Sequence, residues 1–281
     1  MYYVTGIDGF IASNILKKID TAVAWDLSTT DLFHILDSYK TPHALFHLGA
    51  VSSTTEQDTE KLSRLNILSS CKLLEWCIKR DIPFVYASSA SVYGLGNNGF
   101  NEVSDMSPIN YYAISKASFD MFALQKMKDH PNAKIFGLRY FNVYGPNEGH
   151  KDNMASPVYK FIKQASEVGK IEVFEGSEKY VRDFISVEDV VDVTISAKDF
   201  KTSGIYNVGT GIPRSFMDVA NIVSDHTGAK IIEIPFPNHL VGKYQTYTKA
   251  NTNKLINEYN HHFYTLEEGI SRCVDKMVNC E

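Results

Sequence analysis

Residues 2–12 read YYVTGIDGFIA, and this segment gives the strongest indication of the fold. Its aromatic and β-branched start is typical of a short buried strand. Gly6 permits the tight turn that follows, Gly9 allows the backbone to approach a pyrophosphate, and Ala12 allows a helix to pack closely on the strand. A strand, a glycine turn and a helix in this order indicate a dinucleotide-binding unit, in which helix amides hold the phosphates. A tight turn without a ligand is the alternative interpretation.

The second strand is expected over residues 21–26, and it ends at an acidic residue, Asp26. An aspartate at this position can accept hydrogen bonds from both ribose hydroxyls, and it repels a 2′-phosphate. The next basic residue along the chain is Lys40, so no neighbouring cation favours NADP. We therefore predict NAD as the cofactor, with NADP as the alternative. For Asp26 itself, the alternative is an ordinary turn residue.

Strand and helix patterns alternate through the first half of the chain. Further buried strands are expected over residues 44–50, 83–87 and 133–140, and helices over residues 10–19, 31–39, 61–80 and 110–128. The helix over 61–80 would bury an apolar face that comprises Leu62, Leu65, Leu68, Leu73, Leu74 and Ile78. This alternation predicts the α/β class, with a Rossmann-type doubly wound parallel sheet.

The regular alternation ends after Pro146, and the remainder indicates a smaller C-terminal substrate lobe with an interleaved boundary. Strands are expected there over 171–174, 204–209 and 230–234, and helices over 156–167, 187–198, 216–226 and from 265 onward. We assign residues 1–148 and 182–211 to the dinucleotide-binding domain. Residues 149–181 and 212–281 are assigned to the substrate-binding domain.

Charge and composition argue against several classes of partner. The chain has 281 residues, of which 44% are hydrophobic, and a net charge of −5. No block of like charge occurs, so neither nucleic acid nor a membrane surface is an expected partner. The four cysteines form no Cys-x-x-Cys motif, and His261 and His262 are expected to be exposed, so no metal site is predicted. Without a charged leader or a membrane-spanning apolar run, we expect a cytoplasmic protein with reduced thiols.

Residues 110–116 read NYYAISK, which places Tyr112 and Lys116 four positions apart. In a helix, both side chains lie on one face, about one turn from each other. The ammonium would stabilise the phenolate, so we expect the pKa of Tyr112 to fall below its ordinary value. Such a tyrosine can act as a general base toward a hydroxyl. Taken alone, this loose pattern favours an ordinary amphipathic helix start with a surface lysine.

The ends of two strands add candidates to the same site. Ser89 follows the strand over 83–87, and the small residues within 48–50 would let a flat ring pass close to the backbone. In an open parallel sheet, ligands bind beyond the carboxyl ends of the strands. Ser89 is therefore expected to contact the same ligand atoms as Tyr112. A hydroxyl that caps its own turn is the alternative for Ser89.

With these residues, the chain resembles the extended short-chain dehydrogenase/reductases that act on nucleotide sugars, within the NAD-dependent epimerase/dehydratase family. The glycine turn, the segment 89–94 and the Tyr112–Lys116 pair carry this resemblance. Further segments resemble the ADP-L-glycero-D-manno-heptose 6-epimerases within that family, namely residues 48–56, 139–146, 148–151, 154–156, 174–177, 182–184, 234–237 and 244–245. The resemblance extends over nearly the whole chain.

The resemblance implies a redox epimerisation of a nucleotide sugar, in which bound NAD(P) takes a hydride from C6 of an ADP-glycero-manno-heptose and returns it to the other face. Tyr112 would be the acid/base, with Lys116 lowering its pKa and holding the nicotinamide ribose. Ser89 would hydrogen-bond the reacting oxygen. Lys151 would be a second lysine for acid/base work and substrate binding, a surface lysine being the alternative. A homo-oligomer with a role in lipopolysaccharide biosynthesis is also implied.

The implied site residues fall into three groups. The catalytic residues are Ser89, Tyr112, Lys116 and Lys151. The cofactor-binding residues are Gly6, Gly9, Phe10, Ile11, Asp26, Leu27, Leu48, Gly49, Ala50, Ser52, Tyr112, Lys116 and Val143. The substrate-binding residues are Ser89, Asn142, Lys151, Phe174, Glu175, Gly176, Ser177, Arg182 and Tyr244.

The chain departs from the family pattern at two places. Only residues 27–47 separate Asp26 from Leu48, whereas the family has a further strand and helix in this interval. We expect a sheet shortened by one strand–helix unit, a more exposed adenine and a preference for NAD. After Lys151, Asp152 and Asn153 replace a family glycine and serine, which makes the identity of the sugar less secure than the class of reaction.

Two alternatives to a heptose 6-epimerase remain. One is a C4 epimerase or a reductase of another nucleotide sugar. A 4,6-dehydratase is not expected, because those enzymes share an Asp-Glu pair after the serine position, and this chain has Ala90 and Ser91 there. The other is a dinucleotide sensor that binds the cofactor without turnover. The intact set of Ser89, Tyr112, Lys116 and Lys151 argues against a pure sensor.

Overall fold

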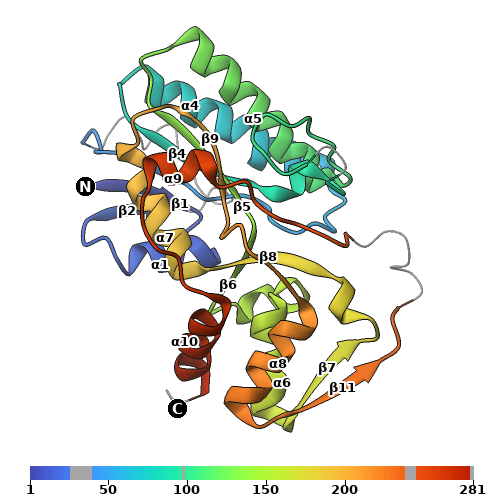
Figure 1. Cartoon of the computed structure of the whole chain (residues 1–281). Helices are drawn as coiled ribbons and strands as arrows, with labels where there is room; N and C mark the ends of the chain where they lie inside the picture. Colours follow the sequence, from blue (N-terminus) through green and yellow to red (C-terminus); the bar gives the residue numbers. More distant parts are fainter. Residues whose placement is uncertain (26–39, 97–98, 238–244, 279–281) are drawn as a thin grey trace. The chain divides into compact units, whose positions relative to one another are not determined.

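The computed structural model describes residues 1–25, 40–96, 99–237 and 245–278 (Figure 1). The chain forms two compact units. Unit 1 comprises Met1–Tyr140, Val190–Val208 and Asn253–Asn260. Unit 2 comprises Phe141–Asp189, Gly209–Thr252 and His261–Glu281.

Unit 1 contains a parallel sheet with the strand order β2-β1-β3-β4-β5-β9 among the described residues. The strands are β1 (Tyr2–Thr5), β2 (Ala22–Trp25), β3 (Leu45–His47), β4 (Phe84–Ser89), β5 (Ile135–Tyr140) and β9 (Gly204–Val208). All neighbouring pairs are parallel. The order runs outward from β1 in both directions, so the predicted doubly wound α/β fold is confirmed.

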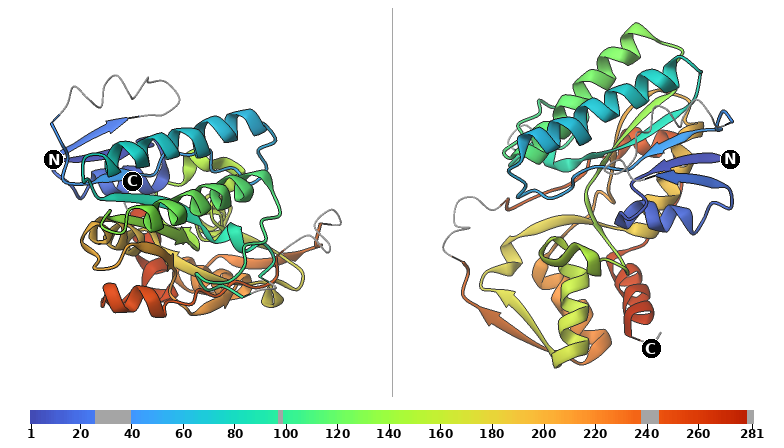
Figure 2. Two further views of the ribbon diagram at one scale, coloured as in Figure 1. Left: turned by 90° about the horizontal axis from the view of Figure 1, so that it is seen from above. Right: turned by 180° about the vertical axis from the view of Figure 1, so that it is seen from behind.

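Helices cover both faces of this sheet. Those of unit 1 are α1 (Phe10–Leu16), α3 (Thr59–Leu62), α4 (Ser69–Ile78), α5 (Tyr111–Asp129), α7 (Val187–Ser196, which begins in unit 2) and α9 (Asn253–Glu258), with short 3-10 helices η2 (Ala90–Tyr93) and η5 (Ala197–Asp199). Helices α4 and α5 lie side by side on one face, and α1 and α7 lie on the other (Figures 1 and 2). Since both faces are covered, the strands carry continuous apolar runs.

The core under α4 and α5 is rich in aromatic side chains. It contains Tyr3, Trp25, Leu45, Leu73, Leu74, Cys77, Ile82, Phe84, Tyr86, Phe119, Ala123 and Ile135. The rings of Tyr86 and Phe119 meet edge to face at 4.8 Å, a favoured geometry for aromatic pairs. This packing fixes α5 against β4, the strand that ends at Ser89.

The helix expected over 61–80 differs from the prediction in its interior. It begins at Thr59, because the Asp58 side chain accepts a hydrogen bond from the Lys61 amide and caps the first turn. The middle, η1 (Ser63–Leu68), is π-helical. The wider turn moves Leu68 out of the apolar face, and this side chain is 54% exposed.

The described part of unit 2 combines two small sheets with three α-helices. One sheet has the order β10-β8-β6, with β6 (Asn142–Tyr144), β8 (Val181–Ser186) and β10 (Pro213–Ser215); β7 (Lys170–Phe174) and β11 (Lys230–Ile234) form a parallel pair. The helices are α6 (Pro157–Val168), α8 (Phe216–Thr227) and α10 (Leu266–Val278), with short 3-10 helices η3 (Gly149–Met154) and η4 (Ser177–Lys179). Their core includes Tyr144, Val158, Ile162, Val173, Val219, Val223 and Ile270.

The two units differ from the predicted domain boundaries. Of residues 182–211, which we assign from the sequence to the dinucleotide-binding domain, 190–208 lie in unit 1, whereas β8 pairs with β6 and β10 and lies in unit 2. Residues 253–260 lie in unit 1 instead of the second domain, and Lys254 Nζ donates to the Ile205 carbonyl there at 2.7 Å. These pairings are made between distant segments, which local sequence patterns do not report.

The segment between Asp26 and Leu48 is described only in part. The helix over 31–39 and most of the shortened interval after Asp26 lie outside the described residues, so the loss of a strand–helix unit stays a prediction. Within the described ranges, no helix has both the length and the apolar character needed to span a bilayer. The same ranges contain no group of three or more His, Cys, Asp or Glu side chains suited to a metal ion.

Candidate active site

The glycine turn after β1 has the geometry that a dinucleotide requires. Gly6 has a φ of +78°, and a Cβ atom there would lie 2.5 Å from the Gly49 Cα, so no larger residue fits. Gly9 is exposed and caps α1 with no side-chain hydrogen bond, so no side chain competes for the first amides of the helix. The Gly9 amide closes the turn by donating to the Gly6 carbonyl at 2.9 Å. The turn therefore fits the phosphates of NAD.

The remaining cofactor candidates are distributed over both units. In unit 1, Phe10 is buried, Ile11, Leu48 and Ala50 are half-buried, and Ser52 is exposed. Val143 lies half-buried on β6 in unit 2. Asp26 and Leu27 lie outside the described residues, so their roles stay predictions.

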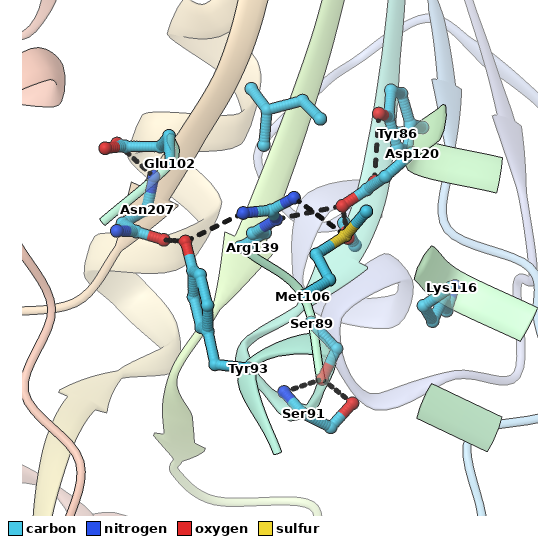
Figure 3. A network of polar contacts seen from close by, with 12 residues as sticks. Tyr86, Ser89, Ser91, Tyr93, Glu102, Met106, Lys116, Asp120, Arg139 and Asn207 are labelled. Atoms are coloured by element: carbon cyan, nitrogen blue, oxygen red, sulfur yellow. Dashed lines mark hydrogen bonds and ion pairs between the residues drawn. The ribbon is translucent and has the colours of Figure 1, made fainter. Parts of the chain in front are cut away.

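Ser89 is the last residue of β4 and also caps the 3-10 helix η2. Its Oγ accepts hydrogen bonds from the Ser91 amide at 3.2 Å and from the Ser91 hydroxyl at 2.9 Å (Figure 3). The same side chain is a hydrogen-bond partner of the Tyr112 phenol. Ser89 therefore caps its own turn and also meets Tyr112, whereas its contact with a ligand stays a prediction.

Tyr112 and Lys116 lie on the first turns of α5, as the spacing predicted. The helix begins at Tyr111 because the Asn110 side chain accepts from the Ala113 amide at 2.8 Å. Tyr112 and Lys116 are 9% and 8% exposed, so this is no surface lysine. Lys116 Nζ donates to the Ala87 carbonyl of β4 at 2.8 Å. The structure thus brings together Ser89, Tyr112 and Lys116.

The sequence predicted that the pKa of Tyr112 falls below its ordinary value, and this prediction is wrong. Burial raises the pKa of Tyr112 above 10.0, and this outweighs the opposing hydrogen bond from Ser89. Asp120 raises the pKa of Tyr112 further. Spacing along a helix predicts which groups are near one another, whereas the pKa also depends on how much water the phenol loses. The phenol of Tyr112 is therefore neutral around pH 7 and holds a proton that it can donate.

The stability of the protein is expected to rise between about pH 8 and pH 10.5 because of Lys116. Burial lowers the pKa of Lys116 from 10.5 to about 8, although Asp120 opposes this shift. Below the lower value, folding bears the cost of burying the ammonium, about 3 kcal/mol. Between the two values the unfolded chain binds more protons, so increasing pH favours the folded state. We expect Lys116→Met to be more stable than wild type near neutral pH.

Denaturant unfolding at about pH 7.5 and about pH 10 measures this effect. The stability advantage of Lys116→Met should shrink toward the higher pH, after allowance for the lost hydrogen bond to Ala87. Lys128→Met is the matched control, because Lys128 is exposed near the end of the same helix. An advantage that is absent, or constant with pH, would contradict a depressed Lys116 pKa.

Asp120 continues the line of functional side chains along α5, one turn beyond Lys116. It is fully buried and accepts hydrogen bonds from Tyr86 Oη and Ser88 Oγ, both at 3.0 Å, and from Arg139 Nε at 2.9 Å. Its charge raises the pKa of Lys116. The carboxylate therefore stabilises the ammonium beside Tyr112. Asp120 is not among the residues predicted from the sequence, although its place four residues after Lys116 was a usable signal.

A chain of polar contacts extends from Asp120 across the sheet (Figure 3). Arg139 is 1% exposed, and its Nη1 donates to Tyr93 Oη at 2.9 Å. Tyr93 Oη donates to Asn207 Oδ1 at 2.7 Å, and Glu102 Oε1 accepts from the backbone N–H of Asn207 at 2.9 Å. The network connects α5, β5 and β9 and satisfies the buried charges, as such groups require. It fixes the strand ends around Ser89.

Lys151 lies in η3 of unit 2 and is held by a buried carboxylate. Its Nζ donates to Glu148 at 2.9 Å, and Glu148 is 0% exposed. The same carboxylate accepts from the Gly145 amide and from the amide and hydroxyl of Ser156. Glu148 is likewise not among the site residues predicted from the sequence. Lys151 and the Tyr112 group belong to different units.

The polar substrate candidates of unit 2 contact backbone and neighbouring side chains. Asn142 Nδ2 donates to the Asp183 carbonyl and to Thr248 Oγ1, each at 3.2 Å. Arg182 is 6% exposed and donates to the carbonyls of Val181 and Gln245, the first at 3.0 Å. The guanidinium also lies over the Phe216 ring, at 5.4 Å from its centroid.

The candidates at 174–177 form the turn after β7. Phe174 is half-buried and meets the Phe236 ring edge to face at 5.6 Å. Glu175 is exposed, Gly176 has a φ of +79°, and Ser177 is buried and donates to the Phe174 carbonyl. Tyr244 lies outside the described residues.

Comparison with known proteins shows which family this chain belongs to. The family model described as "NAD dependent epimerase/dehydratase family" matches residues 2–209. The chain belongs to this family. The prediction of the family from the sequence is confirmed, and so are the enzyme class and NAD as the cofactor.

Several known proteins match this chain over nearly their whole length. An ADP-L-glycero-D-manno-heptose-6-epimerase of Alkalilimnicola ehrlichii is 41% identical over 91% of this chain and 90% of its own. The crystal structure of the Helicobacter pylori ADP-L-glycero-D-manno-heptose-6-epimerase has a TM-score of 0.86 and 28% identity, and the match covers 100% of this chain and 96% of that one. A Thermus thermophilus UDP-glucose 4-epimerase in complex with NAD has a TM-score of 0.80 and 25% identity, covering 98% and 97% of the two chains.

Proposed function

We propose that this NAD-dependent epimerase inverts C6 of an ADP-glycero-manno-heptose. The observation that carries the proposal is the 41% identity to a heptose 6-epimerase over nine-tenths of both chains. The set of Ser89, Tyr112 and Lys116 supports it, because Tyr112 is hydrogen-bonded to Ser89 and Lys116 lies one turn from Tyr112 on the same helix of unit 1. NAD, when bound, supplies the acceptor and donor of the hydride.

The side chains of unit 1 handle the proton of the C6 hydroxyl in this proposal. Only the phenolate form of Tyr112, the minor form near pH 7, can remove that proton as the C6–H bond breaks; the phenol so formed returns it to the carbonyl oxygen when the hydride adds to the opposite face. Ser89 hydrogen-bonds the same oxygen and holds it beside the phenol. Lys116 provides the positive charge that stabilises the phenolate during the transfer. The buried Asp120 in turn stabilises that charge.

For unit 2 we propose roles in substrate binding and in a second proton transfer. Lys151 would act as the second acid/base, and Glu148 would hold its ammonium in place. Arg182 would attract the diphosphate with its positive charge. Asn142, Phe174, Glu175, Gly176, Ser177 and Tyr244 would bind the remaining groups of the nucleotide sugar.

The decisive experiment incubates the purified protein with ADP-D-glycero-D-manno-heptose and NAD and follows the C6 proton by NMR. We expect the signal of the L-glycero epimer to grow until both epimers coexist, with no net consumption of NAD. Turnover of UDP-glucose with no inversion of the heptose would assign the protein to the C4 epimerases instead. Binding of NAD with no turnover of either sugar would favour a dinucleotide sensor.

A cytoplasmic location is part of the same proposal. Cys71, Cys77 and Cys273, the cysteines within the described residues, are free thiols. Burial raises the pKa of Cys71 to about 11 and that of Cys273 to about 12, so both stay protonated and unreactive. Unpaired thiols of this kind are typical of a reducing compartment.

A further inference from the structure

His47 is a buried histidine that the proposed reaction does not use. It is the last residue of β3, 4% exposed, and packs against the rings of Phe84 and Phe119. Both ring nitrogens are hydrogen-bonded: Nδ1 to Thr5 Oγ1 at 2.8 Å, and Nε2 to Ser70 Oγ at 2.7 Å. The imidazole therefore joins the end of β1 to α4 through the core of unit 1.

The partners of His47 determine which nitrogen carries the proton. The Ser70 hydroxyl has one hydrogen and donates it to the Asn66 carbonyl at 2.8 Å, so Ser70 Oγ must accept from His47 Nε2–H. In a neutral ring, Nδ1 then accepts from the Thr5 hydroxyl. Burial lowers the pKa of His47 to about 3, with a further contribution from the charge of Lys116, which agrees with a neutral ring.

The Thr5 end of this chain of hydrogen bonds holds the Gly49 amide. The Gly49 N–H donates to Thr5 Oγ1 at 3.1 Å, which is favoured because the Thr5 hydrogen already points to His47. Gly49 lies directly behind the dinucleotide turn, since a Cβ at Gly6 would lie 2.6 Å from the Gly49 nitrogen. A shift of the Gly49 backbone therefore displaces the Gly6 turn.

The Ser70 end of this chain of hydrogen bonds leads to Val51, which lies in the same loop as Gly49. Asn66 Oδ1 accepts from the Val51 amide at 2.8 Å, and its Nδ2 donates to the Val51 carbonyl at 3.0 Å. Asn66 Nδ2 also donates to Ser115 Oγ at 2.9 Å, next to Lys116 on α5. The loop over 49–51 is thus held at both ends by groups that His47 connects.

We propose that His47, fixed as the neutral Nε2–H form between Thr5 and Ser70, is a positioning residue for the dinucleotide site. Its Nδ1 acceptor orients the Thr5 hydroxyl, the Thr5 oxygen holds the Gly49 amide, and Gly49 supports the Gly6 turn. This inference rests on the NAD dependence of the family and not on the identity of the sugar.

Three substitutions at His47 separate positioning from bulk packing. In His47→Asn, the amide oxygen takes the place of Nδ1 and still accepts from Thr5. In His47→Gln, the amide nitrogen takes the place of Nε2 and still donates to Ser70, but the contact with Thr5 is lost. We expect His47→Gln and His47→Leu to weaken NAD binding about tenfold, the factor for one ordinary buried hydrogen bond. His47→Asn should stay within about threefold of wild type.

The binding constants are measured by calorimetric titration with NAD alone, so the result does not depend on any sugar. Unfolding is recorded for each variant, because a purely structural role would lower stability without ranking Asn above Gln in NAD affinity. Equal affinities of His47→Asn and His47→Gln would overturn the proposal.

A second pair of variants and a spectrum decide the proposal if the His47 variants do not fold. Thr5→Val removes the hydroxyl at nearly constant shape and should weaken NAD binding about tenfold, whereas Thr5→Ser keeps it and should bind as wild type does. In the wild-type protein, ¹⁵N NMR should show the His47 proton on Nε2 from pH 5 to pH 8, roughly the range in which an ordinary histidine titrates. Unchanged binding by Thr5→Val, or a proton on Nδ1, would refute the proposal.

Discussion

Replacing Tyr112 with Phe will lower the rate of epimerisation roughly 10²- to 10⁴-fold, the range that a general acid/base contributes. The substitution removes only the phenolic oxygen, which is the atom that meets Ser89. The ring stays packed, so NAD affinity should remain within a few fold of wild type. Initial rates with the heptose substrate and calorimetric titration with NAD measure both quantities.

Tyr111→Phe is the matched control for this prediction. Tyr111 is adjacent on α5, carries the same functional group and is 46% exposed. Loss of the Tyr111 hydroxyl should leave the rate of epimerisation unchanged. If Tyr112→Phe epimerises as fast as wild type, Tyr112 is not the acid/base.

Replacing Asp120 with Asn will destabilise the protein by about 3–5 kcal/mol, the usual cost of breaking a buried ion pair from one side. The Asp120–Arg139 pair is 0% and 1% exposed, and the substitution leaves the guanidinium charged with no counter-ion at 2.9 Å. Tyr86 and Ser88 also lose a charged acceptor. Denaturant unfolding measures the loss.

Two further variants test the origin of this loss. Glu75→Gln removes an ion pair with Lys126 that joins α4 to α5 and is 45% exposed at Glu75, so its cost should stay below about 1 kcal/mol. Adding Arg139→Met to Asp120→Asn removes the unpaired charge and should restore part of the stability. A loss no greater than that of Glu75→Gln would show that the buried pair does not stabilise the fold.

The parts of the site that depend on local pattern were predictable from the sequence. Gly6 and Gly9 follow a strand and precede a helix, Ser89 ends a strand, and Tyr112 and Lys116 share a helical face. Each of these statements concerns residues within a few positions of one another. Strand ends in a parallel sheet meet at one edge, so the pattern also predicted that Ser89 lies near Tyr112.

The features that the sequence did not reveal depend on distant segments or on burial. Asp120 and Arg139 come together only because α5 packs on β5, and Glu148 becomes buried only in the fold of unit 2. Strand β8 joins unit 2 through its pairing with β6 and β10. The rise in the pKa of Tyr112 follows from the water that the phenol loses, which the spacing to Lys116 does not indicate.

The π-helical segment Ser63–Leu68 changes the rotational phase of the helix that contains it. In a continuous α-helix of 3.6 residues per turn, Leu62 and Leu74 would point about 120° apart. Both are buried, at 2% and 0% exposure, because the wider turns between them bring the two side chains back to one face. Loss of one residue from this segment would make the helix regular but rotate one half away from the sheet. Alignments and designs that treat residues 59–78 as a single regular helix will therefore assign half of its positions to the wrong side.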